Sequence, residues 1–420
     1  MDCGDSSPPS EPKLAEVQPP SFLLSKLRRE RRRQVSALQT RLPLPLMTEK
    51  KRIAIVLGTR PEVIKLASCI HELRAADWAQ VDVLLTGQHG AMLRPLLDHF
   101  GIDPVLELPV RRVRGTLAEL ISLLASAMDQ YCFENRPDAI IVQGDTTSAM
   151  AAAICGYSDR YRVVHVEAGL RSFDLEQPFP EEFNRRVISI AAWLHLAPSD
   201  ESRAHLLKEG IPEDRCHVVG NTVIDALLWT IGGDQAKESP FREGTFRILA
   251  TCHRRESWDG GVEAVCEGLL GLADQIPNAQ ILFPVHPNPT VADVVNRMLG
   301  GNPKVTLVAP LGYREFCFAM SAADLIVSDS GGVQEEALAL GKPTLVTRWK
   351  TERPEVLAWD TVRLVGPDAA AILREGTRLF QDPAYYQACA KAYFPFGHGD
   401  SGCRISTILR NALLPVEISQ

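Results

Sequence analysis

From residue 52 onward, short runs of apolar residues alternate along the chain with longer stretches that have a helical pattern. The apolar runs are rich in valine, isoleucine and leucine, as is typical of strands buried on both faces of a parallel sheet. The predicted strands lie at residues 53–57, 81–85, 139–142, 162–166, 247–251, 280–285, 305–308, 325–327 and 344–346. Strands that alternate with helices predict an α/β fold with parallel, doubly wound sheets.

The series of strands divides into two at Gly220-Asn221-Thr222. In each half, polar or glycine-rich residues follow the strands directly, which is where sheets of this kind bind ligands. We therefore predict two Rossmann-like parallel-sheet domains that face a cleft. The first comprises residues 51–219, completed by a C-terminal helix at residues 400–420, and the second comprises residues 220–399.

Residues 1–50 differ from the rest of the chain. They hold seven of its 29 prolines and a basic run from Lys26 to Arg33, and they show little periodicity. We interpret them as a disordered extension with one short helix at residues 21–38. An alternative is that Met47 is the natural start, in which case the first 46 residues are an artefact of the assigned translation start.

Composition narrows the class of protein. Hydrophobic residues make up 45% of the chain and charged residues 23%, as in a soluble globular protein. The net charge of −7 argues against a nucleic-acid binder, and no run of 18 apolar residues is present to span a membrane. The ten cysteines form no Cys-x-x-Cys pair. Several lie in apolar helical stretches, which favours reduced thiols in a cytoplasmic protein; these are Cys69, Cys155, Cys266 and Cys389.

One turn in the second half suggests a phosphate site. The predicted strand at 325–327 is followed by Ser330-Gly331-Gly332 and then by a helix predicted from Val333 to Leu340. A side-chain-free turn at a helix N-terminus presents free N–H groups and a partial positive charge, both of which suit a phosphate. Glu335 or Glu336, one turn into the helix, suits ribose hydroxyls. The alternative is an ordinary helix with Ser330 as its N-cap.

Two common nucleotide motifs are missing from the sequence. No Gly-x-Gly-x-x-Gly follows the first strand of either half, and the chain has no Gly-x-x-x-x-Gly-Lys-[Ser/Thr] segment. Conventional NAD binding and P-loop ATP hydrolysis are therefore disfavoured. His89, His253 and His286 lack the spacing of a metal site. We predict neither a cofactor nor a metal.

Taken in order along the chain, several motifs resemble those of the non-hydrolysing UDP-N-acetylglucosamine 2-epimerases, a family with the two-domain GT-B architecture. The resemblance runs from about residue 52 to about residue 413. The motifs that carry it are Gly58-Thr59-Arg60-Pro61-Glu62 with Lys65, Gly87-Gln88-His89, Gly144-Asp145-Thr146-Thr147, His165-Val166-Glu167-Ala168-Gly169-Leu170-Arg171, Pro180-Glu181-Glu182 with Asn184-Arg185, Gly220-Asn221-Thr222, His253-Arg254-Arg255-Glu256, Ser330-Gly331-Gly332 with Glu335-Glu336, and Glu352-Arg353-Pro354-Glu355.

The hydrolysing branch of the superfamily, which makes free N-acetylmannosamine, differs at these motifs. It has an alanine at the position of Pro61 and a Glu-Gly-Gly-Glu type of sequence at Glu167-Ala168-Gly169-Leu170. It also lacks the Pro-Glu-Glu-x-Asn-Arg segment. At all three places the chain resembles the non-hydrolysing branch.

The resemblance implies a reaction that inverts C2 of UDP-N-acetylglucosamine to give UDP-N-acetylmannosamine. Because the C2 proton is not acidic, the family eliminates UDP across C1–C2 to a bound glycal and then adds it back with a proton on the opposite face. Such a site needs carboxylates for proton transfer and cations for the departing pyrophosphate. The carboxylates that match the family are Asp145, Glu167 and Glu181.

The remaining site residues also follow from the resemblance. The catalytic cations are Lys65 and His253, expected near the pyrophosphate, and Arg185, expected near the catalytic carboxylates. The residues expected to bind UDP are Arg60, Lys65, Phe316, Ser330, Gly331, Gly332, Glu336 and Arg353. Bacterial members often carry an allosteric substrate site, which Gln88, Arg114, Arg254 and His286 match. However, Gly90-Ala91 replaces the longer polar pair usually found there.

Several of these candidates also have a purely structural explanation. Asp145 fits a helix cap, and Lys65 fits a solvated lysine on a helix. His253 fits a hydrogen-bonded loop histidine. Two pairs have the i,i+4 spacing of simple ion pairs along a helix, and these are Glu181–Arg185 and Glu182–Arg186. The match to the family motifs favours a functional interpretation for Asp145, Lys65, Glu181 and Arg185.

The sequence therefore predicts a cytoplasmic, homodimeric UDP-N-acetylglucosamine 2-epimerase whose partner is a UDP-sugar substrate. One alternative is a C2-epimerase of another UDP-2-acetamido sugar, such as a 2,3-diacetamido uronic acid. Another is a GT-B glycosyltransferase, which would have no need of C2 proton transfer by Glu181 and Arg185. A third is a catalytically silent nucleotide-sugar-binding regulator, which the presence of all three carboxylates disfavours.

Overall fold

The computed structural model describes residues 50–88, 90–103, 106–233, 239–252, 260–351 and 353–414. The chain divides into two units, Met1–Thr48 and Glu49–Gln420, and all that follows concerns the second. The predicted N-terminal extension, its short helix and Met47 lie outside the described residues. So do His89, His253 and Arg254.

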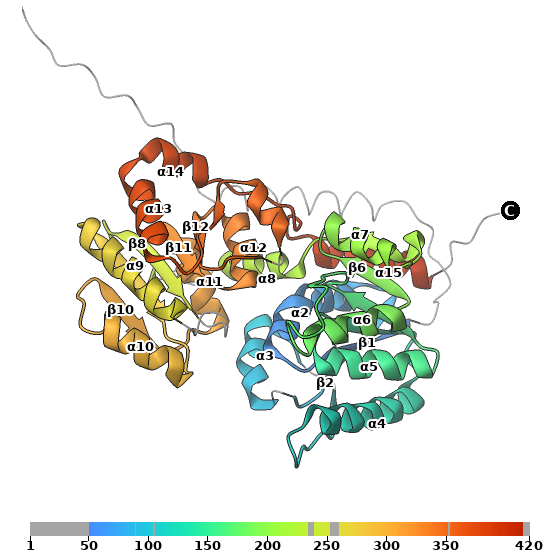
Figure 1. Ribbon diagram of the computed structural model, residues 1–420. Helices are drawn as coiled ribbons and strands as arrows, with labels where there is room; N and C mark the ends of the chain where they lie inside the picture. Colours follow the sequence, from blue (N-terminus) through green and yellow to red (C-terminus); the bar gives the residue numbers. More distant parts are fainter. Residues whose placement is uncertain are drawn as a thin grey trace, which may run out of the picture. The chain divides into compact units, whose positions relative to one another are not determined.

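The first sheet has seven parallel strands in the order β3-β2-β1-β4-β5-β6-β7. Figure 1 labels β1, β2 and β6 of this sheet. Its strands are β1 (Lys51–Leu57), β2 (Ala79–Leu85), β3 (Leu106–Glu107), β4 (Ala139–Gln143), β5 (Arg162–Val166), β6 (Leu194–Ala197) and β7 (Cys216–Val218). The register places Ile53 opposite Val81 of β2 and Ala139 of β4. Because β1 lies between two strands, both of its edges are hydrogen-bonded.

Helices cover both faces of this sheet. They are α2 (Arg60–Ala75), α3 (Arg94–Phe100), α4 (Leu117–Asn135), α5 (Thr147–Ser158), α6 (Glu181–Ala191), α7 (Asp200–Lys208) and α15 (Ser401–Leu413), with 3₁₀ turns η1 (Gly90–Leu93) and η2 (Glu213–Arg215). Helix α8 (Thr222–Ile231) contacts α2 and also packs with residues of the second sheet, such as Leu249. Successive side chains of β1 point to opposite faces. Ile55 packs with Leu66 of α2 and Ile405 of α15. Val56 packs with residues of α4 and α5 such as Met128 and Ala149.

The second sheet has six parallel strands in the order β10-β9-β8-β11-β12-β13. They are β8 (Phe246–Thr251), β9 (Ala279–Pro284), β10 (Val305–Val308), β11 (Leu325–Ser328), β12 (Thr344–Val346) and β13 (Val362–Leu364). The accompanying helices are α9 (Gly261–Gln275), α10 (Pro289–Leu299), α11 (Tyr313–Ala322), α12 (Gly331–Leu340), α13 (Ala369–Gln381) and α14 (Pro383–Cys389), with the 3₁₀ turn η4 (Pro354–Ala358). As in the first sheet, alternate residues of one strand enter different cores: Val327 packs with α9, and Ile326 with α11 and α12.

The predicted fold class is confirmed, because both sheets are parallel and each is layered between helices. The predicted strands are present, with ends that differ by no more than two residues. Four short strands, β3, β6, β7 and β13, were not predicted. The boundaries of the two domains stay a prediction. The C-terminal helix α15 packs on α2, where Gly402 contacts the backbone of Ser68 closely enough to leave no room for a side chain.

The cysteines expected to be helical, namely Cys69, Cys155, Cys266 and Cys389, lie in α2, α5, α9 and α14. Each is buried, and each described cysteine is a free thiol. Among the described residues, no helix is long and apolar enough to cross a membrane.

Candidate active site

The candidate residues gather at the carboxyl ends of strands where the order of each sheet reverses. In the first sheet, β1 and β4 are neighbours, but the helices that follow them, α2 and α5, pack on opposite faces. In the second sheet, β8 and β11 are neighbours, and α9 and α12 again lie on opposite faces. Such switch points open a crevice for ligands in doubly wound sheets.

Glu62 joins the two loops at the switch point of the first sheet. Its side chain is fully buried and accepts hydrogen bonds from Gly58 N (2.8 Å) and Thr59 N (2.6 Å), at the start of α2. It also accepts one from Thr146 Oγ1 (2.6 Å), at the start of α5. Burial raises the pKa of Glu62, and these hydrogen bonds oppose that rise. No role was predicted for Glu62, although Thr59-x-x-Glu62 is a capping-box signal.

Glu167 and Lys65 form a buried ion pair between the end of β5 and helix α2. The same Glu167 oxygen accepts a hydrogen bond from Gln143 Nε2 at 2.9 Å. Glu167 has a left-handed backbone with φ of 63°, which costs a residue with a side chain about 1–3 kcal/mol. Lys65 is therefore not the solvated helix lysine of the structural alternative.

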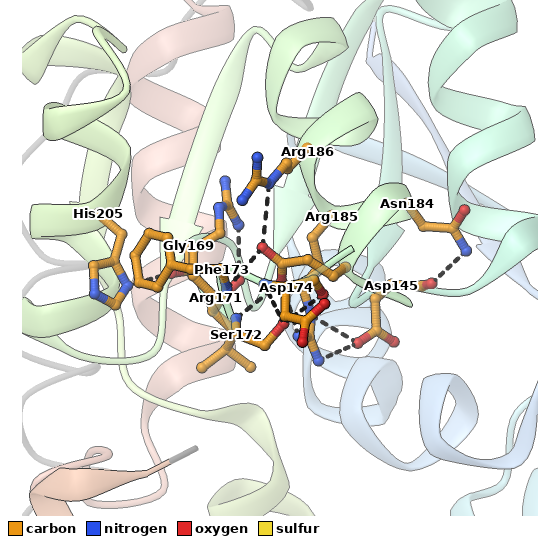
Figure 2. Close-up of polar contacts among 12 residues, drawn as sticks. Asp145, Gly169, Arg171, Ser172, Phe173, Asp174, Asn184, Arg185, Arg186 and His205 are labelled. Carbon is orange, nitrogen blue, oxygen red and sulfur yellow. Dashed lines mark hydrogen bonds and ion pairs between the residues drawn. The ribbon is translucent and has the colours of Figure 1, made fainter. Parts of the chain in front are cut away.

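Asp145 is held by Arg185, as Figure 2 shows. Arg185 Nε and Nη2 both donate to Asp145 Oδ2, at 2.9 and 2.7 Å. Asn184 Nδ2 donates to the backbone carbonyl of Asp145 at 2.8 Å (Figure 2). The cap of α5 is Thr146, whose hydroxyl accepts from Ala149 N. Asp145 is therefore not a helix cap, and the structural alternative for it is wrong.

The loop that carries Asp145 is fixed by a buried histidine. His165 Nε2 lies 2.8 Å from the carbonyl oxygen of Gly144. Burial lowers the pKa of His165 to about 3, so the ring is neutral at physiological pH. Because a carbonyl oxygen only accepts, Nε2 carries the hydrogen. The histidine of the His165–Arg171 motif thus orients the residue that precedes Asp145.

Glu181 and Glu182 open helix α6 and have different surroundings. Glu181 Oε2 is buried, and no described residue donates a hydrogen bond to it. Glu182 is fully buried and forms ion pairs with Arg185 (3.3 Å) and Arg186 (3.2 Å). The simple helix pair predicted for Glu182 and Arg186 is present. No functional role was predicted for Glu182.

The phosphate turn of the second sheet forms the N-terminus of α12. Ser330 is the N-cap, as the pattern predicts, but its side chain makes no capping hydrogen bond to the helix. The helix begins at Gly331, two residues earlier than predicted. The first turn of α12 contains no acidic residue, but the buried Asp329 directly precedes the N-cap.

A buried cluster of charges links this helix to residues of the first sheet. Glu335 forms an ion pair with Arg353 and accepts a hydrogen bond from Asn221 Nδ2 at 2.5 Å. Burial raises the pKa of Glu335. The positive charges of Arg353 and Lys65 lower it, and the negative charge of Glu167 raises it further. The charges of Lys65 and Glu167 therefore act on Glu335, a carboxylate of α12.

Glu336 is the most strongly perturbed member of this cluster. Burial, followed by the neighbouring Glu335, raises the pKa of Glu336 to about 8, while Lys65 and Arg353 act in the opposite direction. The cluster brings together four of the predicted site residues: Lys65, Glu167, Glu336 and Arg353.

The other predicted residues lie around these groups. Arg60 is exposed at the first position of α2. Phe316 is half-buried on α11 and packs against the cluster that includes Val333 of α12. His253 and Arg254 lie outside the described residues, so their roles stay predictions.

Of the predicted allosteric residues, Gln88, Arg114 and His286 are described and lie in separate loops. Gln88 follows β2, and its side-chain oxygen accepts from Ser148 Oγ at 2.6 Å. Arg114 lies in an exposed loop whose backbone amides bond to the carboxylate of Glu119. His286 follows β9 and is half-buried. A second ligand site built from them stays a prediction.

Among the described residues, no group of three or more histidine, cysteine, aspartate or glutamate side chains is arranged to hold a metal ion. Of the three histidines considered from the sequence, only His286 lies within them.

Comparison with known proteins identifies the family. Residues 71–410 match the family described as UDP-N-acetylglucosamine 2-epimerase. The UDP-N-acetylglucosamine 2-epimerase of Salmonella typhimurium is 41% identical over 370 residues, which cover 86% of this chain and 98% of that protein. The chain belongs to the UDP-N-acetylglucosamine 2-epimerase family. The family predicted from the sequence motifs is confirmed.

Solved structures agree with this assignment. The crystal structure of the UDP-GlcNAc 2-epimerase from Neisseria meningitidis, bound to UDP-GlcNAc, matches with a TM-score of 0.80 and 37% identity, over 86% of this chain and all of that one. A glycotransferase of kitacinnamycin matches with a TM-score of 0.60, over 88% of this chain and all of that one. At 13% identity the second match shows the fold alone. The GT-B-like architecture is therefore shared more widely than the activity.

Proposed function

We propose that this protein interconverts UDP-N-acetylglucosamine and UDP-N-acetylmannosamine by eliminating UDP and adding it back. The observation that carries the proposal is the pairing of two strand-end acids with cations: Glu167 with Lys65, and Asp145 with Arg185. Glu181, with a buried carboxylate oxygen, supplies a third acid. The names and bound ligand of the relatives agree with this chemistry.

In the elimination, one carboxylate takes the C2 proton while the C1–O bond to UDP breaks. The electron pair of the C2–H bond becomes the second C1–C2 bond of the glycal, and the departing phosphate oxygen keeps the pair of the C1–O bond. Re-addition reverses these changes, with a protonated carboxyl on the opposite face of the ring returning the proton to C2. Two acids in different environments are therefore needed, one ionised and one protonated.

The proposed roles follow the surroundings of each residue. Asp145, Glu167 and Glu181 are the proton-transfer acids. Lys65 and His253 offset the negative charge that develops on UDP, and Arg185 holds Asp145. The N-terminus of α12 at Ser330, Gly331 and Gly332 binds the phosphates. The residues proposed to complete the UDP site are Arg60, Phe316, Glu336 and Arg353.

Proton NMR of UDP-N-acetylglucosamine with the protein in heavy water tests this proposal. Deuterium at C2, together with UDP-N-acetylmannosamine, is the expected result. Free N-acetylmannosamine with UDP would show a hydrolysing enzyme instead. No exchange, with UDP still bound, would reject this substrate and leave the other UDP-sugars and glycosyl transfer as the functions to test.

We also propose that the protein is a cytoplasmic homodimer. Free buried thiols agree with a reducing compartment. Large apolar side chains are exposed on α4, α5 and α6, consecutive helices that pack side by side (Figure 1). They include Phe133 (77% exposed), Tyr157 (62%) and Ile190 (77%). Exposed apolar residues on adjacent helices are typical of a surface that a second subunit covers.

A further inference from the structure

Glu182 is a buried carboxylate on which four donors converge, although the proposed chemistry does not use it. Its Oε1 accepts from Phe173 N at 3.3 Å and Arg186 Nε at 3.2 Å. Its Oε2 accepts from Ser172 N at 3.0 Å and Arg185 Nη1 at 3.3 Å. These donors come from α6 and from the loop that follows β5 (Figure 2). A carboxylate held by four donors from two segments has a fixed position between them.

One consequence concerns Arg185, whose guanidinium lies between two carboxylates. Its Nε and Nη2 face Asp145, and its Nη1 faces Glu182. The side chain of Glu182 is fully buried, whereas that of Asp145 is 28% exposed. Glu182 is therefore the fixed partner, and it sets the plane in which Arg185 meets Asp145.

A second consequence concerns the loop after β5. Ser172 and Phe173 follow Glu167 closely in the chain, and Phe173 has a left-handed backbone with φ of 60°. Their amides bond to Glu182, the residue next to Glu181. The segment that begins at Glu167 is thus fastened to the first turn of α6.

Arg171 anchors the same loop from its other side. Its buried guanidinium forms two hydrogen bonds of 2.7 Å with Glu209 and one of 2.8 Å with Ser189 Oγ. Arg171 therefore holds the loop to α6 and to the end of α7, and Glu182 holds it to the start of α6. Only the second contact also includes the arginine that meets Asp145.

We propose that Glu182 is a positioning residue for C2 epimerisation, holding Arg185 against Asp145 and the loop after β5 against the helix turn that carries Glu181. Through these contacts it fixes the relative places of the three proton-transfer acids. The inference rests on the proposed function. A favourable acid near the N-terminus of a helix is the simpler explanation, but it does not account for donors from another segment.

Kinetics of Glu182→Gln test the proposal, with Asp225→Asn as the matched control. Asp225 is also a buried carboxylate that accepts two backbone amides, those of Ser401 and Gly402. Both substitutions should lower the melting temperature, because each leaves buried donors poorly paired. Only Glu182→Gln should lower kcat, by at least about tenfold, since small misplacements of reacting groups are costly. The Kd for UDP should change by less than about twofold in both.

A double substitution separates positioning from a general loss of structure. If Glu182 acts through Arg185, then Glu182→Gln should lower kcat by less than about twofold when added to Arg185→Met. A kcat within about twofold of the unaltered protein for Glu182→Gln alone would overturn the proposal. A loss in the Arg185→Met background as large as that in the unaltered one would overturn the part of the proposal that acts through Arg185.

A crystal structure of the Glu182→Gln protein decides the geometric part even if UDP-N-acetylglucosamine proves not to be the substrate. Loss of the Arg185–Asp145 contact, or displacement of residues 172–174, is the expected result. An unchanged Arg185 and an unchanged loop would overturn the proposal. Failure of the unaltered protein to exchange the C2 proton would refute the proposed function separately.

Discussion

At the scale of single residues, the acids of the site differ in their surroundings. Glu167 forms an ion pair with a lysine, and Asp145 with an arginine. Glu336 is buried beside another acid, and both effects raise its pKa, to about 8. The strand-end acids thus have cationic partners, whereas Glu336 has a neighbour of its own charge.

Removing the charge of either strand-end acid should abolish most of the turnover. We expect Glu167→Gln and Asp145→Asn each to lower kcat at least about a hundredfold, the lower range for a positioned acid or base. The Kd for UDP, measured by calorimetry, should change little, because neither residue is proposed to contact UDP. Near-normal turnover in both variants would contradict the assignment.

The raised pKa of Glu336 predicts a pH dependence of UDP binding. A carboxylate accepts hydrogen bonds from both ribose hydroxyls, whereas the protonated form accepts fewer. With a pKa of about 8 in the free protein, the ionised fraction rises steeply between pH 7 and 8.5. Affinity for UDP should therefore increase roughly five- to tenfold over this interval. Calorimetry on Glu336→Gln, which cannot ionise, should show no such increase; parallel curves for the two proteins would refute the role.

Ionisation of Glu336 should also affect the stability of the protein, in the opposite direction to its effect on UDP binding. The folded protein holds a proton on Glu336 that the unfolded chain releases near pH 4.5, so stability from this group is lost as pH rises from about 4.5 to about 8. Glutamine does not ionise, so Glu336→Gln should abolish this pH-dependent loss of stability. Its melting temperature, relative to the unaltered protein, should therefore be higher at pH 8.5 than at pH 5. An equal difference at both values would contradict the burial of an acid here.

At the scale of elements, the loop after β5 depends on a glycine that lies against α7. Gly169 has φ of 90°, and a Cβ atom there would collide with the backbone carbonyl of Ser202. His205 Nδ1 also contacts the Gly169 carbonyl at 3.0 Å (Figure 2). The helix therefore approaches the loop too closely for any side chain.

Alanine at Gly169 should destabilise the protein more than alanine at Gly210. Gly210 has nearly the same φ, 87°, but a Cβ atom there would have no atom within 4 Å. Gly210→Ala should therefore lower the free energy of unfolding by about 1 kcal/mol, the cost of placing alanine in a left-handed backbone. Gly169→Ala adds a collision with the backbone of Ser202, so it should lower the free energy of unfolding further. It should also lower kcat, because it displaces the loop that carries Glu167. Urea unfolding of both variants measures the difference; equal losses would show that the loop moves freely away from α7.

The sequence predicted the elements with strong periodicity and missed those without it. In β6, His195 interrupts a run of only four residues, and in β13 Arg363 interrupts three. Neither run is long enough to show a period. Helix α12 was predicted to begin at Val333 because Gly331 and Gly332 have low helix propensity, although the first turn of a helix tolerates them.

The site was predictable only where its contacts are local. The capping-box spacing of Thr59 and Glu62 is visible in the sequence, whereas the bond from Thr146 to Glu62 is tertiary. The i,i+4 spacing of Glu182 and Arg186 indicated only a simple ion pair along a helix. The burial of Glu182 depends on amides of Ser172 and Phe173 from a different segment, and no spacing along the chain encodes that.

At the scale of the whole unit, polar contacts join residues that follow the two sheets. Asn221 comes directly before α8 and bonds to Glu335 of α12. Ser199, which follows β6, bonds to Glu355 of η4 at 2.6 Å. Lys65 interacts with acids from both sheets. Each contact joins a residue of the first sheet's loops or helices to an acid of α12 or η4, so charges that belong to the two sheets interact directly.

The exposed apolar surface of α4, α5 and α6 gives a direct test of the proposed dimer. Ile190 is 77% exposed on α6, so lysine there should cost the folded subunit little. In a dimer that covers this surface, the buried charge should shift the protein to monomers. Light scattering after size-exclusion chromatography measures this mass, with Leu106→Lys on strand β3 as the control, since Leu106 is 40% exposed and lies on a strand rather than on these helices. A monomeric unaltered protein would refute the dimer. A dimeric Ile190→Lys protein would place the interface elsewhere.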